Sequence, residues 1–321
     1  MYRQFLFIFL VLSCGMSSWV CADTVVRVSF DTTQVYELEE IEFAQPRKRT
    51  PLVPVQTMDS KALTLLNTQS VADAIRFFSG VQLKDFGGVG GIKTINIRSM
   101  GTQQMGVFYD GIQLGNAQNG QIDLGRFSVD NLEEIKLYNG QKTDILQSAK
   151  DYGAAGTIYL TTKVPQFTQG KTRFTATMKA GSFGLANPSL LWQQKWSDKV
   201  TSSVSAEYTY ATGRYHFRNQ KKAPDGTVLY DTVMVRENAD INAVRAEAAV
   251  FGHLYKGRWK AQMYNYYSER GLPGYVARNV YAHEQRQWDN NFFVQASFNK
   301  QVLSFYELLL KAKYAYDYTR Y

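Results

Sequence analysis

Apolar and polar side chains alternate along Val200-Thr201-Ser202-Ser203-Val204-Ser205-Ala206-Glu207-Tyr208-Thr209-Tyr210. In an extended strand, a period of two gathers alternate side chains on opposite faces. Val204 and Tyr208 therefore share an apolar face, while Glu207 lies on a polar one. The stretch predicts a β-strand whose two faces meet different surroundings.

Six further segments repeat this alternation, at 172–180, 188–196, 241–254, 258–267, 291–300 and 304–318. The segments are about 9–14 residues long, near or above the roughly 9–11 that a tilted strand needs to cross a bilayer. Aromatic residues near their ends (Trp192, Trp196, Tyr208 and Tyr210) are typical of membrane-barrel girdles. A soluble β-sandwich also alternates, but its strands are commonly about 5–6 residues long. The pattern therefore favours an antiparallel membrane β-barrel over 165–321.

Composition agrees with a strand-rich protein. The chain has 321 residues, of which 45% are hydrophobic, 20% charged and 14% aromatic, and its mean hydropathy is −0.31. These values fit neither a disordered chain nor a polytopic helical membrane protein, and the aromatic content favours strands. The net charge of +8 is a mild excess, and the densest basic run is only Arg47-Lys48-Arg49. No nucleic-acid partner is therefore predicted.

The first residues predict export. Arg3 precedes the apolar run Phe5–Leu12, and Val20-Cys21-Ala22 fits a signal-peptidase site, so residues 1–22 are predicted to be a signal peptide. The run is shorter than the roughly 20 residues of a spanning helix, which disfavours a membrane anchor. A lipoprotein signal ending at Cys14 is an alternative, disfavoured by the bulky residue that precedes it. Both cysteines of the chain lie in this segment, so disulfides and thiolate sites are not expected after cleavage.

The segment 23–43 is polar and acidic, without a core period, and is interpreted as a flexible arm. The segment 44–164 is predicted to be a mixed α/β domain. Within it, apolar residues recur at helical spacing over 70–78, between a cap at Ser70 and a stop at Gly80. Short strands are predicted at 94–98, 106–109, 134–138 and 157–160. Asp110-Gly111 predicts a tight hairpin turn, because these residue types tolerate positive φ angles.

Five ordered motifs between residues 70 and 163 resemble the plug domain of TonB-dependent outer-membrane receptors. They are Ser70–Ile75 with Ser79-Gly80-Val81 (the family's "PGV" turn), Ile95-Asn96-Ile97-Arg98-Ser99 ("IxIRG"), Val107–Leu114 ("VLIDGVPL"), Leu132–Gly140 ("IERIEVLRGP") and Tyr152–Lys163 ("YGxxAIGGVINIITK"). Three positions depart from the family pattern: Ser79 replaces Pro, Ser99 replaces Gly, and Asn139 replaces Arg.

The resemblance implies a mixed α/β plug domain followed by an antiparallel membrane β-barrel of about 22 strands. Seven strands cannot close such a barrel, and Tyr321 lies in an alternating run. The chain is therefore expected to be part of a longer receptor of the cell outer membrane. By resemblance, that receptor imports a scarce nutrient, contacts outer-membrane lipid and takes its energy from a TonB-type partner. A passive outer-membrane binding protein, which needs no such partner, is the alternative from another class.

Two segments of the arm compete as the TonB box, which must add as a strand to the partner's sheet. One is 23–28. The other, favoured because it lies just before Gln45-Pro46-Arg47 as in the resembled family, comprises Leu38, Glu39, Glu40, Ile41, Glu42 and Phe43.

Two apical plug segments are expected, by resemblance, to meet the ligand. Their residues are Phe86, Gly87, Gly88 and Val89 in the first, and Asn116, Gln118 and Asn119 in the second. The plug length and the apex 85–91 look most similar to cobalamin receptors. The side-chain amides can exchange hydrogen bonds with corrinoid amides, and Phe86 offers a flat apolar contact. A ferric siderophore is the alternative ligand; an anionic chelate favours Arg or Lys, which barrel loops rather than these segments would supply.

Other chemistry has little support in the sequence. The glycine-rich 87–91 precedes a strand-like segment rather than a helix, which disfavours a phosphate loop and favours a flexible apical loop. The three histidines, His216, His253 and His283, lack metal-ligand spacing. The longest inter-strand loop holds weak Ca²⁺ candidates, Asp225, Asp231 and Asp240, although Pro224-Asp225-Gly226 is more simply a turn. No cofactor and no enzymatic activity are predicted.

Overall fold

The computed structural model describes residues 55–115, 121–140, 142, 152–168, 170–274, 276–277, 280–281, 284–303 and 305–321. The chain divides after Arg49, and every described residue belongs to Thr50–Tyr321. The predicted signal peptide and arm, 1–43, lie outside the described residues, and so do Asn116, Gln118 and Asn119.

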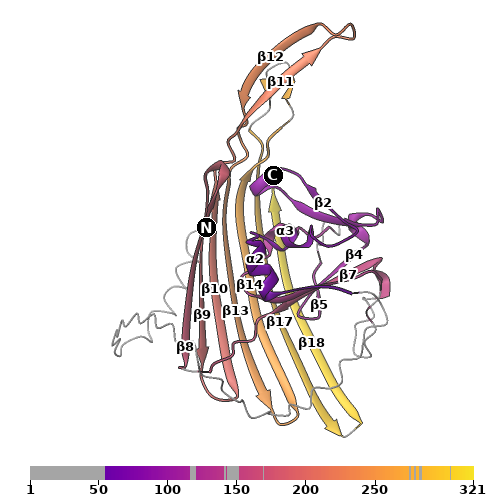
Figure 1. The fold of residues 1–321 in the computed structure, drawn as a ribbon. Coiled ribbons are helices and arrows are strands. Elements are labelled where there is room, and N and C mark those ends of the chain that lie inside the picture. Colours follow the sequence, from indigo (N-terminus) through magenta and orange to yellow (C-terminus); the bar gives the residue numbers. More distant parts are fainter. Residues whose placement is uncertain are drawn as a thin grey trace, which may run out of the picture. The chain divides into compact units, whose positions relative to one another are not determined.

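The plug region is built on a five-stranded mixed sheet in the order β1-β6-β7-β4-β5 (Figure 1). Its strands are β1 (Val55–Asp59), β4 (Met105–Tyr109), β5 (Ile112–Gln113), β6 (Leu132–Tyr138) and β7 (Gly156–Thr162). Strands β4 and β7 are parallel, and the other neighbours are antiparallel. A second sheet pairs β2 (Val81–Asp85) with β3 (Lys93–Ile97), and the helices are α2 (Ser60–Leu66) and α3 (Val71–Ile75). The mixed α/β prediction is confirmed.

Helix α3 begins as predicted and ends early. The Ser70 hydroxyl caps it by accepting a hydrogen bond from the Asp73 amide at 3.4 Å. The predicted range reached residue 78, but the amides of Phe77 and Phe78 bond to carbonyls only three residues back. Such bonds tighten the last turn and end the α-helix. Among the described residues, no helix is long and apolar enough to cross a membrane.

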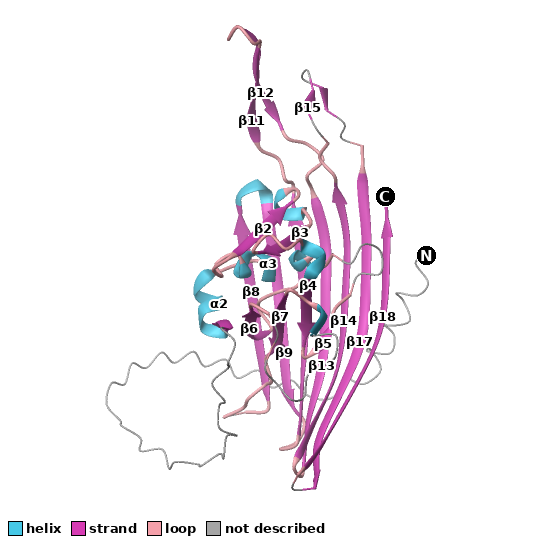
Figure 2. Ribbon diagram, turned by 90° about the vertical axis from the view of Figure 1, so that its right-hand side faces the viewer, coloured by secondary structure: helices cyan, strands magenta, loops and turns pink. Residues whose placement is uncertain are grey.

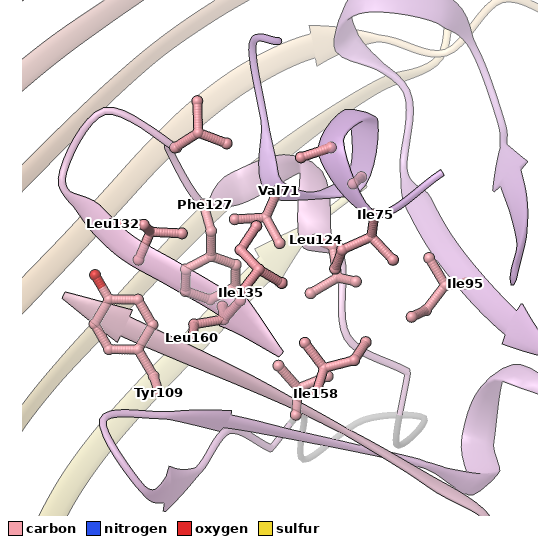
Figure 3. Close-up of a cluster of buried hydrophobic side chains, with 14 of the residues drawn as sticks. Val71, Ile75, Ile95, Tyr109, Leu124, Phe127, Leu132, Ile135, Ile158 and Leu160 are labelled. Carbon is pink, nitrogen blue, oxygen red and sulfur yellow. The ribbon is translucent and has the colours of Figure 1, made fainter. Parts of the chain in front are cut away.

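The larger of two apolar clusters in the described residues joins the plug elements (Figure 3). Its fully buried plug members come from α3, from the short helical turn η3 (Leu124–Arg126) and from strands β6 and β7; they include Val71, Ile75, Leu124, Leu132, Ile135, Ile158 and Leu160. Burying each such side chain contributes about 1.5–3 kcal/mol. This cluster holds the helices against the sheet. It also includes buried residues of the long strands that follow, among them Leu185, Ile241 and Tyr264, so the plug shares its core with those strands.

The predicted hairpin turn is confirmed at Asp110-Gly111. The two residues have φ angles of 49° and 75°, and they join β4 to β5 with Tyr109 opposite Ile112. Both angles lie in the left-handed region, where Asp and Gly are the favoured residues.

The remaining long strands form one antiparallel sheet of seven, which we call the wall, in the order β18-β17-β14-β13-β10-β9-β8. They are β8 (Thr172–Gly181), β9 (Leu185–Lys195), β10 (Val200–Ala211), β13 (Ile241–Leu254), β14 (Gly257–Gly271), β17 (Arg286–Leu303) and β18 (Tyr306–Arg320). Each corresponds to one predicted alternating segment. Strands β14 and β17 extend furthest beyond their predicted ranges, because the pairing between them continues to Gly271 and Arg286.

The two faces of the wall differ as the alternation predicts. One row across five strands, on the face away from the plug, is Val204, Ala248, Met263, Val294 and Tyr314. All but Ala248 are large apolar residues exposed to the surroundings. The intervening side chains, among them Glu247 and Gln295, are buried against the plug. An apolar outer face and a polar inner face are the pattern of a membrane barrel.

The connections of the wall are all short at one end, whereas the other end has one short connection, 182–184, and two long ones. The turns 196–199 and 255–256 are tight, whereas 212–240 and 272–285 are long. The sequence placed 212–240 in a loop, but the structure has a hairpin there, of β11 (His216–Lys222) and β12 (Val228–Val235) (Figure 2). Its strands alternate only briefly, and exposed charges on both strands hide the period. A small hairpin, β15 (Val276–Ala277) with β16 (Val280–Tyr281), lies in the other long connection.

Replacing Ser99 with Gly is expected to raise the free energy of unfolding by about 0.5–1 kcal/mol, because Ser99 has a φ of +60° that glycine adopts without strain. The same change at the neighbouring Met100, which is not among the residues with positive φ, is expected to lower stability. Thermal unfolding of the full-length protein in detergent measures both. Equal effects of the two substitutions would contradict the explanation by backbone strain.

Candidate functional site

The first predicted ligand segment forms an ordered turn at the end of β2. The Phe86 amide bonds to the Ile92 carbonyl at 3.1 Å, and the Asp85 carboxylate accepts from the amides of Gly87 and Gly88 at 3.1 and 3.0 Å. Gly88–Gly90 is a 3₁₀ turn, η1. The predicted loop thus has the form of a turn held by its own aspartate. We call residues 86–91 the apex.

The two sides of the apex differ in exposure. The Phe86 side chain is 62% exposed, so it is free to contact a ligand. Val89 is half-buried and packs against the hydrophobic core. Gly90 is buried, and a Cβ atom built on it would lie 2.9 Å from Cβ of Ile241 on the wall. Among the predicted ligand residues that the structure describes, Phe86 is therefore available to a ligand, whereas the Val89 side chain is turned toward the core.

A polar cavity of about 40 Å³ lies behind the apex, between plug and wall. Its lining includes the charged residues Asp73, Lys93, Asp123, Glu207, Arg245 and Arg270. Two polar atoms of lining residues, the amide oxygen of Asn187 and Nε of Arg270, have neither a hydrogen-bond nor an ion-pair partner among the described residues. A polar space of this size suits ordered water, since one water needs roughly 10–15 Å³.

The Asp110 carboxylate of the predicted turn binds both plug and wall. Within the plug, it accepts hydrogen bonds from the Thr162 amide at 3.0 Å and the Thr162 hydroxyl at 3.1 Å. From wall strand β14, the Lys260 ammonium lies 2.5 Å from its other oxygen. Both side chains of this ion pair are largely buried. Charge-assisted bonds in such surroundings are stronger than neutral ones.

A second polar contact centres on Glu247 of β13. Its carboxylate accepts from the Tyr109 hydroxyl at 3.0 Å and from the Asn131 amide at 3.2 Å, both from the plug. Burial, and then the nearby carboxylate of Glu247, raise the pKa of Tyr109 well above its ordinary value, so its hydroxyl stays a donor. The Phe293 ring of the wall packs edge-on against Tyr109, with centroids 6.0 Å apart.

Lysines on the two edge strands of the wall donate hydrogen bonds to oxygen atoms of the plug. Lys179 on β8 donates to the Asp130 carboxylate at 2.8 Å. At the far side, Lys311 and Lys313 on β18 donate to the carbonyls of Gly111 and Gln113 at 2.8 and 3.0 Å. The plug is therefore hydrogen-bonded to both edge strands of the wall, β8 and β18, and it covers the polar face of the sheet.

The three aspartates proposed for Ca²⁺ have separate partners. Asp231, on β12, pairs with Arg218, whose hydrogen bond lowers the pKa of Asp231. Asp240 pairs with Arg286 at 2.8 Å, and the Asp225 carboxylate accepts from the Thr227 amide at 3.0 Å within its turn. Among the described residues, no three carboxylate, histidine or cysteine side chains gather as metal ligands. The structure does not bring the three aspartates together.

A small α/β domain bonded to the polar face of an antiparallel sheet, whose other face is apolar, has the fold of a plugged membrane barrel. Residues 47–154 match the TonB-dependent Receptor Plug Domain. The structure thus has the fold of a plug domain followed by part of a plugged barrel, and receptors that carry this plug domain are proteins of the outer membrane, as the sequence indicated. The matched family consists of receptors rather than enzymes.

Solved structures of several transporters and receptors share the fold, and three serve as examples. They are the FrpB iron transporter from Neisseria meningitidis (F3-3 variant; TM-score 0.64, 10% identity, 84% of this chain and 42% of that chain), the siderophore receptor PiuA from Acinetobacter baumannii (0.57, 14%, 83% and 36%) and the copper transporter OprC (0.58, 14%, 83% and 37%). The chain thus spans 36–42% of the length of these three proteins. Their names describe iron, siderophore and copper, and give no support to the resemblance to cobalamin receptors.

Proposed function

We propose that this chain supplies the plug and one section of the barrel of an outer-membrane receptor, which imports a scarce nutrient with energy from a TonB-type partner. The observation that supports this best is the plug's position against the polar face of the wall, where Asp110, Glu247 and other buried groups bond it in place. A domain so placed would block passage through the barrel. Import then requires that these bonds be broken, which needs an energy source.

The orientation follows from the lengths of the wall connections. Outer-membrane barrels have short periplasmic turns and longer extracellular loops. By this rule the end with 212–240 and 272–285 faces outward, and the end with 196–199 and 255–256 faces the periplasm. The wall's apolar outer row would then contact outer-membrane lipid. The arm 23–43, with the proposed TonB box Leu38–Phe43, would reach the energy-transducing partner on the periplasmic side.

For the ligand, we propose a corrinoid such as cobalamin first, with a ferric siderophore as the alternative. The exposed ring of Phe86 supports a flat apolar contact, and the amides of Asn116, Gln118 and Asn119 suit a neutral ligand bearing amides. The alternative is supported by the iron transporter and the siderophore receptor among the solved structures of the same fold. Either ligand would be met at the apex.

Full-length receptor is expected to bind cobalamin at micromolar concentration or tighter, and a ferric catecholate siderophore not at all. Isothermal titration of both ligands, side by side on one preparation, measures this. Binding of the siderophore alone would refute the corrinoid proposal and establish the alternative. Dissipating the inner-membrane proton gradient should stop uptake in cells; continued uptake would favour a passive binding protein.

Phe86→Ala is expected to weaken binding of whichever ligand is recognised by about tenfold, or roughly 1.4 kcal/mol, because the exposed ring supplies the apolar contact of the apex. The matched control is Phe77→Ala, since Phe77 is a plug phenylalanine of similar exposure, 57%, outside the apex. Dissociation constants of the two variants test the role. A loss for Phe77→Ala as large as that for Phe86→Ala would show that the apex has no special part.

A further inference from the structure

Four charged side chains form a closed ring between plug and wall. Asp123 and Arg126 come from the plug at η3, Arg270 from β14 and Asp289 from β17. Arg126 lies 3.2 Å from Asp123 and 3.3 Å from Asp289; Arg270 lies 2.6 Å from Asp289 and 3.5 Å from Asp123. No member is more than 12% exposed. The two positive and two negative charges cancel within the buried ring.

The ring is joined to the apex at two points. The Arg270 guanidinium donates to the Gly90 carbonyl at 3.0 Å, at the wall side of the apex. The other oxygen of Asp123 accepts from the Lys93 amide at 3.0 Å, where strand β3 leaves the apex. Together with the contact of Gly90 on Ile241, these bonds hold the second half of the apex against the wall.

Arginine is suited to this position in a way that other residues are not. The Arg270 side chain is only 2% exposed and addresses the Gly90 carbonyl, Asp123 and Asp289 at once. The planar guanidinium presents several donors in a fixed fork, whereas a lysine offers one compact ammonium. A buried ionic group is commonly no more stabilising than well-packed apolar residues. Its presence here is therefore better explained by the geometry that it imposes on the apex.

We infer that Arg270 is a positioning residue for ligand recognition: it fixes the apex on wall strands β13 and β14, so that Phe86 is presented in one place. The consequence for affinity rests on the proposed function. A loop that is already ordered loses less conformational freedom when a ligand binds. Arg270 itself is buried and does not touch the ligand; it acts through Gly90.

The test uses full-length receptor carrying a spin label at Lys84→Cys, an exposed position two residues before the apex. Arg270→Lys is expected to make this label more mobile in the absence of any ligand. A second label, at the exposed Lys61→Cys on α2, should keep its mobility. A purely structural loosening of the plug would mobilise both labels and would overturn the inference, as would an unchanged label at position 84.

Arg286→Lys is the matched control, because Arg286 also pairs with two carboxylates, those of Asp240 and Glu269, but makes no contact with the apex. It should change neither label. If Arg270→Lys does not fold, Gly90→Ala serves as the second variant: its methyl group would meet Ile241 and lift the apex while leaving the ionic ring intact. It should mobilise the label at position 84 alone, and no change there would contradict the inference.

Affinity for cobalamin and for the ferric catecholate siderophore is then measured on the unlabelled variants. Arg270→Lys should weaken the probe that the wild type binds by about tenfold, and Arg286→Lys should leave it within twofold. A mobile apex with unchanged affinity would show that the apex is not where the ligand is recognised, and would overturn the recognition role. If neither probe binds the wild type, the ligand proposal fails, while the label measurements still decide whether Arg270 holds the apex.

Discussion

Placing proline at Ile41 is expected to abolish energised uptake while leaving ligand binding at the cell surface intact. A segment that adds as a strand to a partner's sheet is held by main-chain hydrogen bonds. Proline removes one amide donor and fixes φ near −65°, and these main-chain hydrogen bonds to the partner can then no longer form. The arm contains none of the residues proposed to meet the ligand, so the first encounter with ligand should be unaffected.

The measurement compares uptake of labelled ligand by energised cells with surface binding by de-energised cells, each carrying Ile41→Pro. The control is proline at Thr33, which lies between the two competing segments and should leave uptake normal. Proline at Val26 tests the competing segment, 23–28. Normal uptake with Ile41→Pro, together with loss for Val26→Pro, would move the TonB box to the mature N-terminus.

Asp110→Asn is expected to lower the free energy of plug unfolding by about 3–5 kcal/mol, the cost of leaving one partner of a buried ion pair unpaired. Asparagine tolerates the positive φ of this position nearly as well as aspartate, so the turn itself is preserved. What is lost is the carboxylate charge that faces the Lys260 ammonium at 2.5 Å. Urea titration of full-length receptor in detergent, followed by a probe on the plug, measures the loss.

The double variant Asp110→Asn/Lys260→Met separates the ion pair from the turn. It removes both charges, so that no uncompensated buried charge remains, and most of the lost stability should return. Asp231→Asn is the control for charge removal in general, because its ion pair with Arg218 is on the exposed hairpin and such pairs contribute little. If the double variant is no more stable than Asp110→Asn, the loss of stability arises in the turn rather than in the ion pair.

Local features of the fold could be predicted because neighbouring residues carry the signal. Alternation with a period of two predicted all seven wall strands, and Asp110-Gly111 predicted the β4–β5 turn. Helix α2 was missed although its caps are present in the sequence: the Asp59 carboxylate accepts from the Ala62 amide at 2.8 Å, and Asn67 ends the helix with a φ of 47°. Its short length leaves too few apolar positions for a clear helical period.

The candidate site was predictable only in part. The motif at 85–91 located the apex, but nothing in it indicates that Phe86 is exposed while Gly90 is buried against Ile241. The hairpin β11–β12 was taken for a loop, because its strands carry charges on both faces and are paired mainly with each other. Burial and exposure in these places depend on the neighbours that the fold supplies.

The sequence by itself determined the mixed α/β fold of the plug, the seven strands of the wall and the difference between its two faces. Each of these depends on residues close together in the chain. Only the tertiary structure decided which polar residues meet. Tyr109 bonds Glu247 and Arg270 bonds Gly90 across 138 and 180 residues of chain, and alternation shows only that Glu247 and Arg270 face inward. Partner choice follows from how plug and wall pack together, because a buried charge must find its counterpart in space rather than in sequence.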